Sequence, residues 1–313
     1  MSAKPLGSTT AVPDAMNDRP ACTRLSAFAR KTRLVVNADD FGLTPRINEG
    51  ILHAHRQGIV TSTSLMAVGR AFEHAVHCCR TTPALDVGVH LTVVAERPLL
   101  AKTSLSTQDG QFPASAGAFL RRWFRGGIRR ADLEAEWSAQ IEHVLAQGIR
   151  VTHLDSHQHL HILPGLADLS RRLAARYHIP FIRLPMENPW RWEWPDRHAF
   201  NRMCGAAVLG GCGLLAHLTA RQPTPRSLRF LGFHDGGRLD CPRLARLLRS
   251  LRPGQSYELM CHPGLSPDEP DVRDWGYQHE TEMLALTDPA ILSEITNRDI
   301  QLCSFAGLEQ LHS

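Results

Sequence analysis

The stretch RLVVNADDFGLTPRINEGILHAHRQ (Arg33–Gln57) joins a short apolar, β-branched run to a longer segment with a helical pattern. Arg33–Ala38 has the composition of a buried strand, and two adjacent carboxylates, Asp39 and Asp40, follow it directly. Pro45–Gln57 has the spacing of apolar residues that is typical of a helix. A strand that leads at once into a helix is the repeating unit of α/β proteins with parallel sheets.

The same alternation of short apolar runs and longer helical patterns continues along the chain. Further strands are predicted at Val60–Ala67, Asp86–Leu91, Arg150–Asp155, Phe181–Leu184, Leu228–Phe233, Tyr257–Cys261 and Ile300–Phe305. Helices are predicted between them at Arg70–Arg80, Arg130–Gln147, Leu166–Tyr177, Cys241–Leu251 and Pro289–Asn297. These eight strands with intervening helices predict an α/β fold in the form of an irregular (β/α) barrel. An open doubly wound sheet is the alternative, although it would use fewer of the strands.

The composition is that of an ordinary globular protein with a surplus of histidine. The chain has 313 residues, of which 43% are hydrophobic, and this excludes a mostly disordered protein. Its 35 Lys and Arg against 31 Asp and Glu give a formal charge of +4, which is too small to indicate nucleic-acid binding. The 17 histidines contrast with 3 tyrosines, and histidine is the commonest metal ligand. The composition therefore justifies a search for a metal site.

The domain organisation is predicted from local composition. Residues 1–30 contain Pro, Ser, Thr and Asp without an apolar core, which predicts a flexible tail rather than a secretory signal. Residues 31–313 are expected to form a single domain with a Trp- and Arg-rich insertion near residues 185–226. The chain has no run of about 18 apolar residues, so no transmembrane segment is expected. The eight cysteines include no C-x-x-C pair, which favours reduced thiols and a cytoplasmic location.

Polar and charged residues gather at the predicted strand ends. They are Asp39, Asp40, His90, the segment His153–His161, Arg183, His234, Asp235 and His262. In parallel α/β folds the carboxyl ends of the strands meet at one rim, where catalytic groups collect. The sequence thus predicts that acidic and imidazole groups converge on one site.

The adjacent carboxylates Asp39 and Asp40 are the first centre of this site. Their burial after an apolar strand is costly unless a cation offsets the charge. Because neighbours in an extended chain point to opposite sides, one carboxylate would bind a metal while the other faces the substrate. The alternative is that Asp39 or Asp40 only caps the following helix or shapes the turn before it.

Imidazole groups supply the other expected ligands. His157 follows the fourth strand most closely, and Asp155 is suited to orient a ligand imidazole. His90 ends the third strand, where the alternative is a buried core imidazole, and His262 lies at the end of the seventh. Two further histidines are expected only to cap or pack the following helix, namely His159 and His161.

One carboxylate and two imidazoles with an open position form a mixed oxygen and nitrogen site for a divalent cation with access to water. Such a site polarises a carbonyl group and lowers the pKa of bound water. A spare carboxylate as general base and a separate histidine as general acid would complete a hydrolase. An amide is the expected substrate bond, because its amine leaving group needs a proton. A thiol nucleophile at Cys261 is the less favoured interpretation.

Five motifs, in order, resemble the YdjC-like carbohydrate deacetylase family, which includes deacetylases of chitooligosaccharides and of N-acetylglucosaminyl hopanoid lipids. The motifs are Asn37–Leu43 (NADDFGL), Gly58–Ser64 (GIVTSTS), Gly88–Leu91 (GVHL), His153–His159 (HLDSHQH) and Met260–Gly264 (MCHPG). Together they extend over most of residues 32–305. The resemblance implies an irregular (β/α) barrel of the glycoside hydrolase/deacetylase type.

The resemblance also implies one divalent metal ion, commonly Mg²⁺ with Zn²⁺ or Mn²⁺ as alternatives, and its ligands would be Asp40, His90 and His157. It implies Asp39 as the base that activates water, and it suggests His262 as the acid that protonates the leaving amine. By analogy with related deacetylases, Arg183 would hold Asp39 ionised. The implied substrate is an acetylated amino sugar in an oligosaccharide or a glycolipid, and a homodimer is implied as well.

Two other functions are kept open. An amidohydrolase-type metal enzyme would use His157 and His159, although the H-x-H pair of that superfamily ends the first strand rather than the fourth. A non-catalytic sugar- or metal-binding barrel would lack the base. The insertion is a candidate lid over a sugar, a surface for a lipid-linked substrate or a packed helical insertion, and its aromatic residues are Trp190, Trp192 and Trp194.

Overall fold

The structure is a computed structural model that describes residues 31–188, 199–218 and 225–311. The expected tail at residues 1–30 and the three tryptophans of the insertion lie outside the described residues. The elements follow one another in the order β1 (Thr32–Phe41), α1 (Pro45–Gln57), β2 (Ser62–Leu65), α2 (Phe72–Thr81), β3 (Asp86–Leu91), α3 (Ala116–Phe124), α4 (Arg130–Leu145), β4 (Val151–Ser156), η1 (His157–Ile162), α5 (Ala167–Arg176), β5 (Phe181–Ile182), α6 (Ala199–Leu218), β6 (Arg229–Leu231), α7 (Cys241–Ser250), β7 (Ser256–Cys261), α8 (Pro270–Arg273), α9 (His279–Thr287), α10 (Pro289–Asn297), β8 (Ile300–Leu302) and α11 (Phe305–Gln310).

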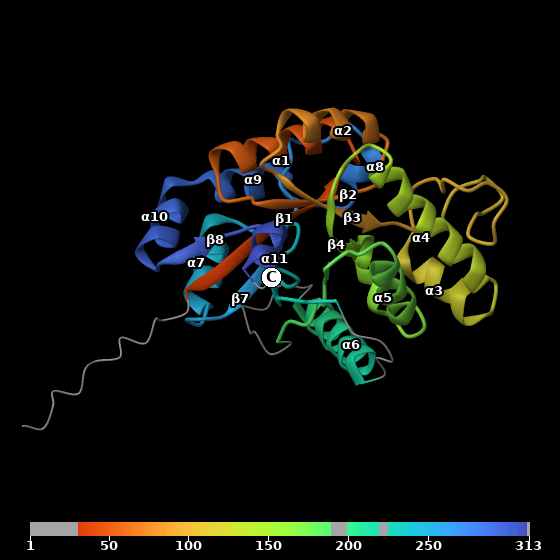
Figure 1. The fold of residues 1–313 in the computed structure, drawn as a ribbon. Helices are drawn as coiled ribbons and strands as arrows, with labels where there is room; N and C mark the ends of the chain where they lie inside the picture. The colour runs from red at the N-terminus through yellow and green to blue at the C-terminus, as the bar shows by residue number, and fades with distance from the viewer. Residues whose placement is uncertain (1–30, 189–198, 219–224, 312–313) are drawn as a thin grey trace, which may run out of the picture.

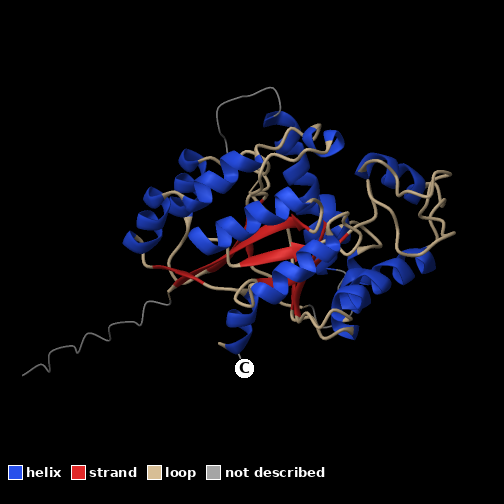
Figure 2. Ribbon diagram, turned by 90° about the horizontal axis from the view of Figure 1, so that it is seen from above, coloured by secondary structure: helices blue, strands red, loops and turns tan. Residues whose placement is uncertain are grey.

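A parallel sheet forms the centre of the molecule, and helices cover its outer side (Figures 1 and 2). The strand order is β5-β4-β3-β2-β1-β7-β6, and β8 pairs with the start of β1. The sheet curls so that its first and last strands approach each other. A parallel bridge joins Phe181 of β5 to Arg226, which lies just before β6. The backbone N–H of Ile182 donates to the carbonyl of Arg226 at 2.9 Å, so the two edges of the sheet meet there. The predicted irregular (β/α) barrel is confirmed.

The eight predicted strands are all present, with differences at their ends. The strand Asp86–Leu91 and the helices Pro45–Gln57 and Pro289–Asn297 begin and end where the sequence predicts. The fifth strand is shorter than predicted and comprises only Phe181–Ile182. The first strand is longer, because its pairing with β2 continues to Phe41.

The core lies between the sheet and its covering helices, and α1 illustrates how the sequence builds it. The side chain of Thr44 caps this helix by accepting a hydrogen bond from the N–H of Ile47 at 3.2 Å. Ile47 and Ile51, one turn apart, are completely or almost completely buried against the sheet. Burial of such a side chain contributes about 1.5–3 kcal/mol.

The helix α6 makes up most of the described part of the predicted insertion, and it lies at the edge of the molecule (Figure 1). Its sequence AFNRMCGAAVLGGCGLLAHL contains one charged residue, Arg202. Within the described parts of the chain, none of the helices combines the length and the hydropathy that a membrane span needs.

Candidate active site

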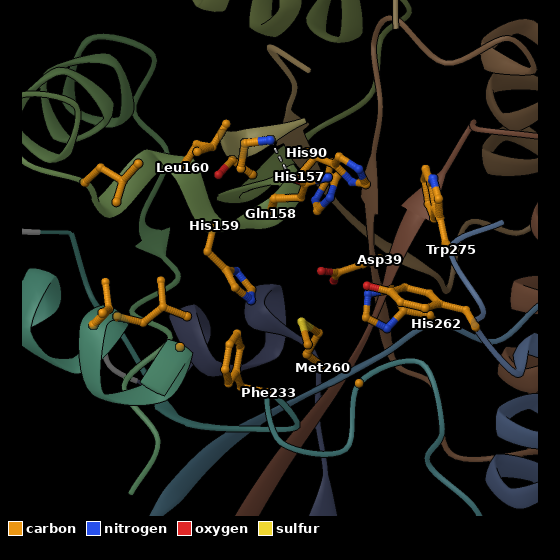
Figure 3. A pocket seen from close by; sticks show the side chains of 18 of the residues that line it. Asp39, His90, His157, Gln158, His159, Leu160, Phe233, Met260, His262 and Trp275 are labelled. Atoms are coloured by element: carbon orange, nitrogen blue, oxygen red, sulfur yellow. Dashed lines mark hydrogen bonds between the residues drawn. The ribbon is translucent and has the colours of Figure 1, made fainter. Parts of the chain in front are cut away.

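A pocket of about 540 Å³ lies at the carboxyl ends of the strands (Figure 3). Asp39 near the end of β1 and His90 near the end of β3 line it. His157 directly after β4 and His262 directly after β7 line it as well. The structure therefore brings these four predicted strand-end residues to one pocket.

Asp39 and Asp40 reach the same site because β1 contains an irregularity at this point. The register with β2 shifts between Ala38 and Phe41, and Asp40 has a φ angle of 66°. A left-handed backbone costs a non-glycine residue about 1–2 kcal/mol, but it re-aims the side chain. The two carboxylates take different partners, since Asp39 contacts Arg183 whereas Asp40 contacts His157 and His90. The cap interpretation is wrong, since Thr44 caps α1.

Three side chains converge as the resemblance implies for a metal site. Nδ1 of His157 lies 2.9 Å from Oδ1 of Asp40, and Nε2 of His90 lies 3.4 Å from the same oxygen. All three residues are at most 7% exposed. The two imidazole rings meet edge to face with their centroids 5.6 Å apart.

Asp155 orients His90, as the sequence predicts for a ligand imidazole. Its Oδ1 lies 2.8 Å from Nδ1 of His90, which directs the other ring nitrogen toward Asp40. Burial lowers the pKa of His90, but the charges of the surrounding carboxylates and the hydrogen bonds with Asp155 and Asp40 outweigh it and raise this pKa to about 10. The hydroxyl of Ser64 donates to Oδ2 of Asp155 at 2.7 Å and fixes its second oxygen.

Arg183 lies beneath the pocket and contacts three carboxylates. Its Nη1 and Nη2 donate to the two oxygens of Asp39 at 2.5 and 2.7 Å. Nη2 also lies 2.8 Å from Oδ2 of Asp155, and Nε donates to Oε1 of Glu258 at 2.6 Å. Burial opposes the charged form of Arg183, but the three carboxylates hold its pKa well above the ordinary value.

Glu258 is a residue of this site that the sequence analysis missed. It lies in the middle of β7, and it is 1% exposed. Burial raises its pKa to about 7, although the charge of Arg183 acts in the opposite direction. The sequence does contain a sign of this role, because Glu258 is a charged residue inside an otherwise apolar strand. A charged side chain is rarely buried without a partner of opposite charge.

His262 lines the pocket, and the centroid of its ring lies 4.8 Å from that of Tyr277. Burial lowers the pKa of His262 to about 4, so its ring is neutral at neutral pH. Its Nδ1 is buried without a hydrogen-bond partner among the described residues. The carboxylate of Glu282 accepts the backbone N–H of His262 at 2.5 Å and thereby fixes the turn after β7.

Two aromatic residues border the pocket that the sequence analysis did not single out. The ring of Trp275 packs against His157 with a centroid separation of 5.1 Å, and Tyr277 covers His262. Both lie in the loop between α8 and α9, outside the strand ends that guided the prediction. Figure 3 shows Trp275 at the edge of the pocket beside the imidazoles.

The remaining predicted residues divide between the pocket and the core. His159 was expected only to cap or pack a helix, but it lines the pocket between Phe230 and Phe233, with ring centroids 5.8 Å from each. His161 packs as predicted, because its Nε2 lies 2.8 Å from the carbonyl of Arg183.

Three further strand-end residues lie away from the pocket. The ring of His234 points to the carbonyl of Asn188 at 3.0 Å, and Asp235 is buried near Arg243. Cys261 is completely buried, and burial raises the pKa of its thiol well above the ordinary value. A nucleophilic role for this thiol is therefore excluded on physical grounds.

The residues present fit a divalent cation. Ligand atoms of Asp40, His90 and His157 lie within 4.8 Å of one another, and Oδ2 of Asp40 is buried with no hydrogen-bond partner in the described part of the chain. His159 belongs to neither cluster of metal-ligating atoms found among the described residues, which argues against a site built from His157 and His159. Four carboxylates are buried in this region, namely Asp39, Asp40, Asp155 and Glu258, and all but Asp40 contact Arg183. An excess of buried negative charge is costly unless a cation offsets it.

Comparisons with a family model, with curated proteins and with solved structures relate this chain to the same group of proteins. A family model described as YdjC-like protein matches residues 33–297. A carbohydrate deacetylase from Geobacillus stearothermophilus is 33% identical over 279 residues, which is 88% of this chain and 98% of the relative. A carbohydrate deacetylase from Vibrio cholerae is 31% identical over 285 residues, covering 90% of this chain and 99% of the relative.

A solved structure from Enterococcus faecalis, described as a candidate cellobiose-phosphate cleavage protein, superposes with a TM-score of 0.70 at 25% identity. The match covers 89% of this chain and 99% of the other. The motifs, the barrel and the match over most of the sequence agree, and the chain belongs to the YdjC-like family.

Proposed function

We propose that this protein is a metal-dependent hydrolase that removes the N-acetyl group from an acetylated amino sugar. The observation that carries the proposal is the position of Asp39, a carboxylate clamped by Arg183 directly beside the cluster of Asp40, His90 and His157. A base next to a cation site in a pocket is the arrangement that amide hydrolysis requires.

The proposed metal ligands are Asp40, His90 and His157. A divalent ion held there would polarise the acetamide carbonyl and lower the pKa of a water molecule. Mg²⁺ is the metal that we propose, while the two imidazoles would also suit Zn²⁺ or Mn²⁺.

Asp39 is proposed to take the proton from the attacking water, and Arg183 to hold the carboxylate in place. His262 is proposed to give a proton to the nitrogen as the C–N bond breaks. Because burial lowers the pKa of His262 to about 4, its neutral ring must first receive that proton, and the one taken by Asp39 is the source that we assign. Water and the amide are then converted into acetate and a free amine.

The relatives support a carbohydrate substrate, since both are named carbohydrate deacetylases. Trp275 and Tyr277 provide aromatic surface of the kind on which sugar rings pack. We further propose that residues 31–313 form one catalytic domain, with the described helix of the insertion near residues 185–226 beside the site. A homodimer in the cytoplasm is proposed from the family resemblance and from the cysteine pattern.

Acetate release from a panel of N-acetylated sugars tests this function. The protein is stripped with a chelator and assayed after addition of Mg²⁺, Zn²⁺ or Mn²⁺, one at a time. We expect acetate and a free amine in equal amounts with at least one metal, and no release without metal. Metal-independent release, or binding of the sugars without release, would overturn the proposal in favour of another hydrolase or a binding module.

A further inference from the structure

The two imidazoles on either side of Asp39 are oriented in different ways. An oxygen of Asp155 lies 2.8 Å from Nδ1 of His90 and sets the direction of that ring. Nδ1 of His262 is buried and has no hydrogen-bond partner among the described residues, although its ring stands beside Asp39 in the pocket (Figure 3). The direction of the His262 ring therefore depends on its own backbone and on its packing against Tyr277.

Two hydrogen bonds hold the peptide groups on either side of the Cα atom of His262. The carboxylate of Glu282 accepts the backbone N–H of His262 at 2.5 Å. Nδ1 of His279 lies 2.8 Å from the carbonyl oxygen of His262, and because a carbonyl can only accept, this nitrogen carries the hydrogen. Fixing both peptide groups fixes the φ and ψ angles between them, and with these angles the direction of the Cα–Cβ bond.

Both of these partners come from the first turn of α9, which is itself tied to the barrel. His279 and Glu282 are three residues apart, so they lie on one face of the helix, and they are 4% and 0% exposed. The backbone N–H of Gly264 donates to the carbonyl of His279 at 3.2 Å. The carboxylate of Glu282 also accepts the backbone N–H of Leu239 at 3.1 Å. The helix thus joins the segments that follow β6 and β7.

We propose that His279 and Glu282 are positioning residues, which hold the backbone of His262 so that its imidazole points to the nitrogen of the substrate. Neither side chain is among those that line the pocket, so both would act through His262 rather than on the substrate. This inference rests on the proposed deacetylase function and on His262 as the acid. It adds the part of the fold that orients the acid.

A double-mutant cycle tests whether His279 acts through His262. The kcat for acetate release is measured with the metal-loaded protein on N-acetylglucosamine or N,N′-diacetylchitobiose, whichever the parent protein hydrolyses faster. We expect His262→Gln to lower kcat about 100-fold or more, because the acid is lost. We expect His279→Ala alone to lower kcat at least about tenfold, because the acid is misplaced. In a protein that already carries His262→Gln, His279→Ala should change kcat by less than about twofold, since no acid is left to position.

A conservative variant and a matched control accompany the cycle. His279→Asn should restore most of the activity, because its side-chain amide can offer an N–H where Nδ1 of the imidazole lies. His55→Ala is the control, since Nδ1 of His55 also lies 2.8 Å from a backbone carbonyl, that of Val60, and its kcat should stay within about twofold of the parent protein.

Glu282→Gln repeats the test from the other peptide group, with urea unfolding of every variant to show that it is folded. The two carboxylate oxygens of Glu282 accept from Leu239 and His262, and a glutamine of the same shape has only one accepting oxygen. We expect kcat to fall in the parent protein and to change by less than about twofold in the protein that carries His262→Gln.

The outcomes separate this inference from the proposed function. An equal fold loss of kcat from His279→Ala with and without His262→Gln would overturn the positioning role and indicate a general structural one. A His262→Gln variant with the kcat of the parent protein would overturn the acid and the inference while leaving the deacetylase function intact. Failure of the parent protein to release acetate with any of the metals would overturn the proposed function itself.

Discussion

Arg183 donates hydrogen bonds to both carboxylate oxygens of Asp39, with Nη1 2.5 Å from Oδ2 and Nη2 2.7 Å from Oδ1. A planar guanidinium can make this two-point contact, whereas a lysine ammonium cannot. We expect Arg183→Lys to lower kcat at least about 100-fold and the free energy of unfolding by about 3 kcal/mol, because buried carboxylates lose partners. Acetate release and urea unfolding measure the two effects.

Arg172→Lys is the control for that substitution. Arg172 forms ion pairs with Glu134 and Asp168 near the surface, where such pairs contribute little. We expect its kcat to stay within about twofold of the parent protein. An Arg183→Lys variant as active as this control would refute the role of the two-point contact.

The role of Asp39 as base predicts a separation of activity from metal binding. We expect Asp39→Asn to abolish acetate release, because the amide cannot take the proton from water. Metal content, measured by elemental analysis, should stay near one ion per chain, since the proposed ligands are other residues. Full activity in this variant, or complete loss of its metal, would contradict the assignment.

Glu258 positions Arg183 without reaching the pocket. Its Oε1 accepts from Nε of Arg183 at 2.6 Å, and a glutamine would preserve that acceptor while an alanine would leave a buried donor without a partner. We expect Glu258→Ala to lower kcat about tenfold or more with little change in KM, and Glu258→Gln to restore most of the activity. Identical kcat values for the two variants would show that the hydrogen-bond acceptor at position 258 does not determine the activity.

Gly88 is required by the packing of β3 against β4. A Cβ at this position would overlap the imidazole of His153, which stacks on Phe305 at 4.0 Å. We expect Gly88→Ala to lower the free energy of unfolding by about 2 kcal/mol or more, because the imidazole of His153 packs against Phe305 and cannot move away from the added methyl group. Gly210→Ala in α6 is the control, since a Cβ there meets no atom of the described residues within 4 Å and should raise stability by about 0.5–1 kcal/mol.

The neutral state of His161 predicts a pH dependence of stability. Burial lowers its pKa from 6.5 to about 4, so below pH 6.5 the unfolded chain takes up a proton that the folded chain does not. The contribution of this group is therefore present above pH 6.5 and is lost as the pH falls toward 4. It amounts to about 2 kcal/mol between pH 7 and pH 5.

The variant His161→Asn should lack this component. Urea unfolding of the parent protein and the variant, at pH 7 and pH 5, gives the four free energies needed. We expect the parent protein to lose more stability than the variant on acidification. An equal loss in both proteins would mean that His161 is protonated in the folded state as well.

The barrel was predictable because each buried parallel strand is a short apolar run, and these runs alternate with helical patterns that begin and end clearly, as at Pro45 and Asn297. The convergence of His90, His157 and Asp40 was predictable for a related reason, since the carboxyl ends of parallel strands share one rim.

Other features of the site could not be predicted from the sequence. The left-handed backbone of Asp40 changes one dihedral angle, and nothing in the hydrophobic pattern records it. Glu258 lies in mid-strand, and its partner Arg183 is 75 residues away. Trp275 and Tyr277 belong to a loop whose path depends on the packed barrel rather than on local propensity.

The irregularity at Asp40 also bears on when the site forms during synthesis. The residues just before it, Arg33–Ala38, pair on one side with Ser256–Cys261 of β7. A growing chain carries all three proposed ligands once His157 has emerged, yet the strand that pairs with the residues just before Asp40 emerges about a hundred residues later. Ion capture is therefore expected to follow the synthesis of β7, rather than to initiate folding of the N-terminal half.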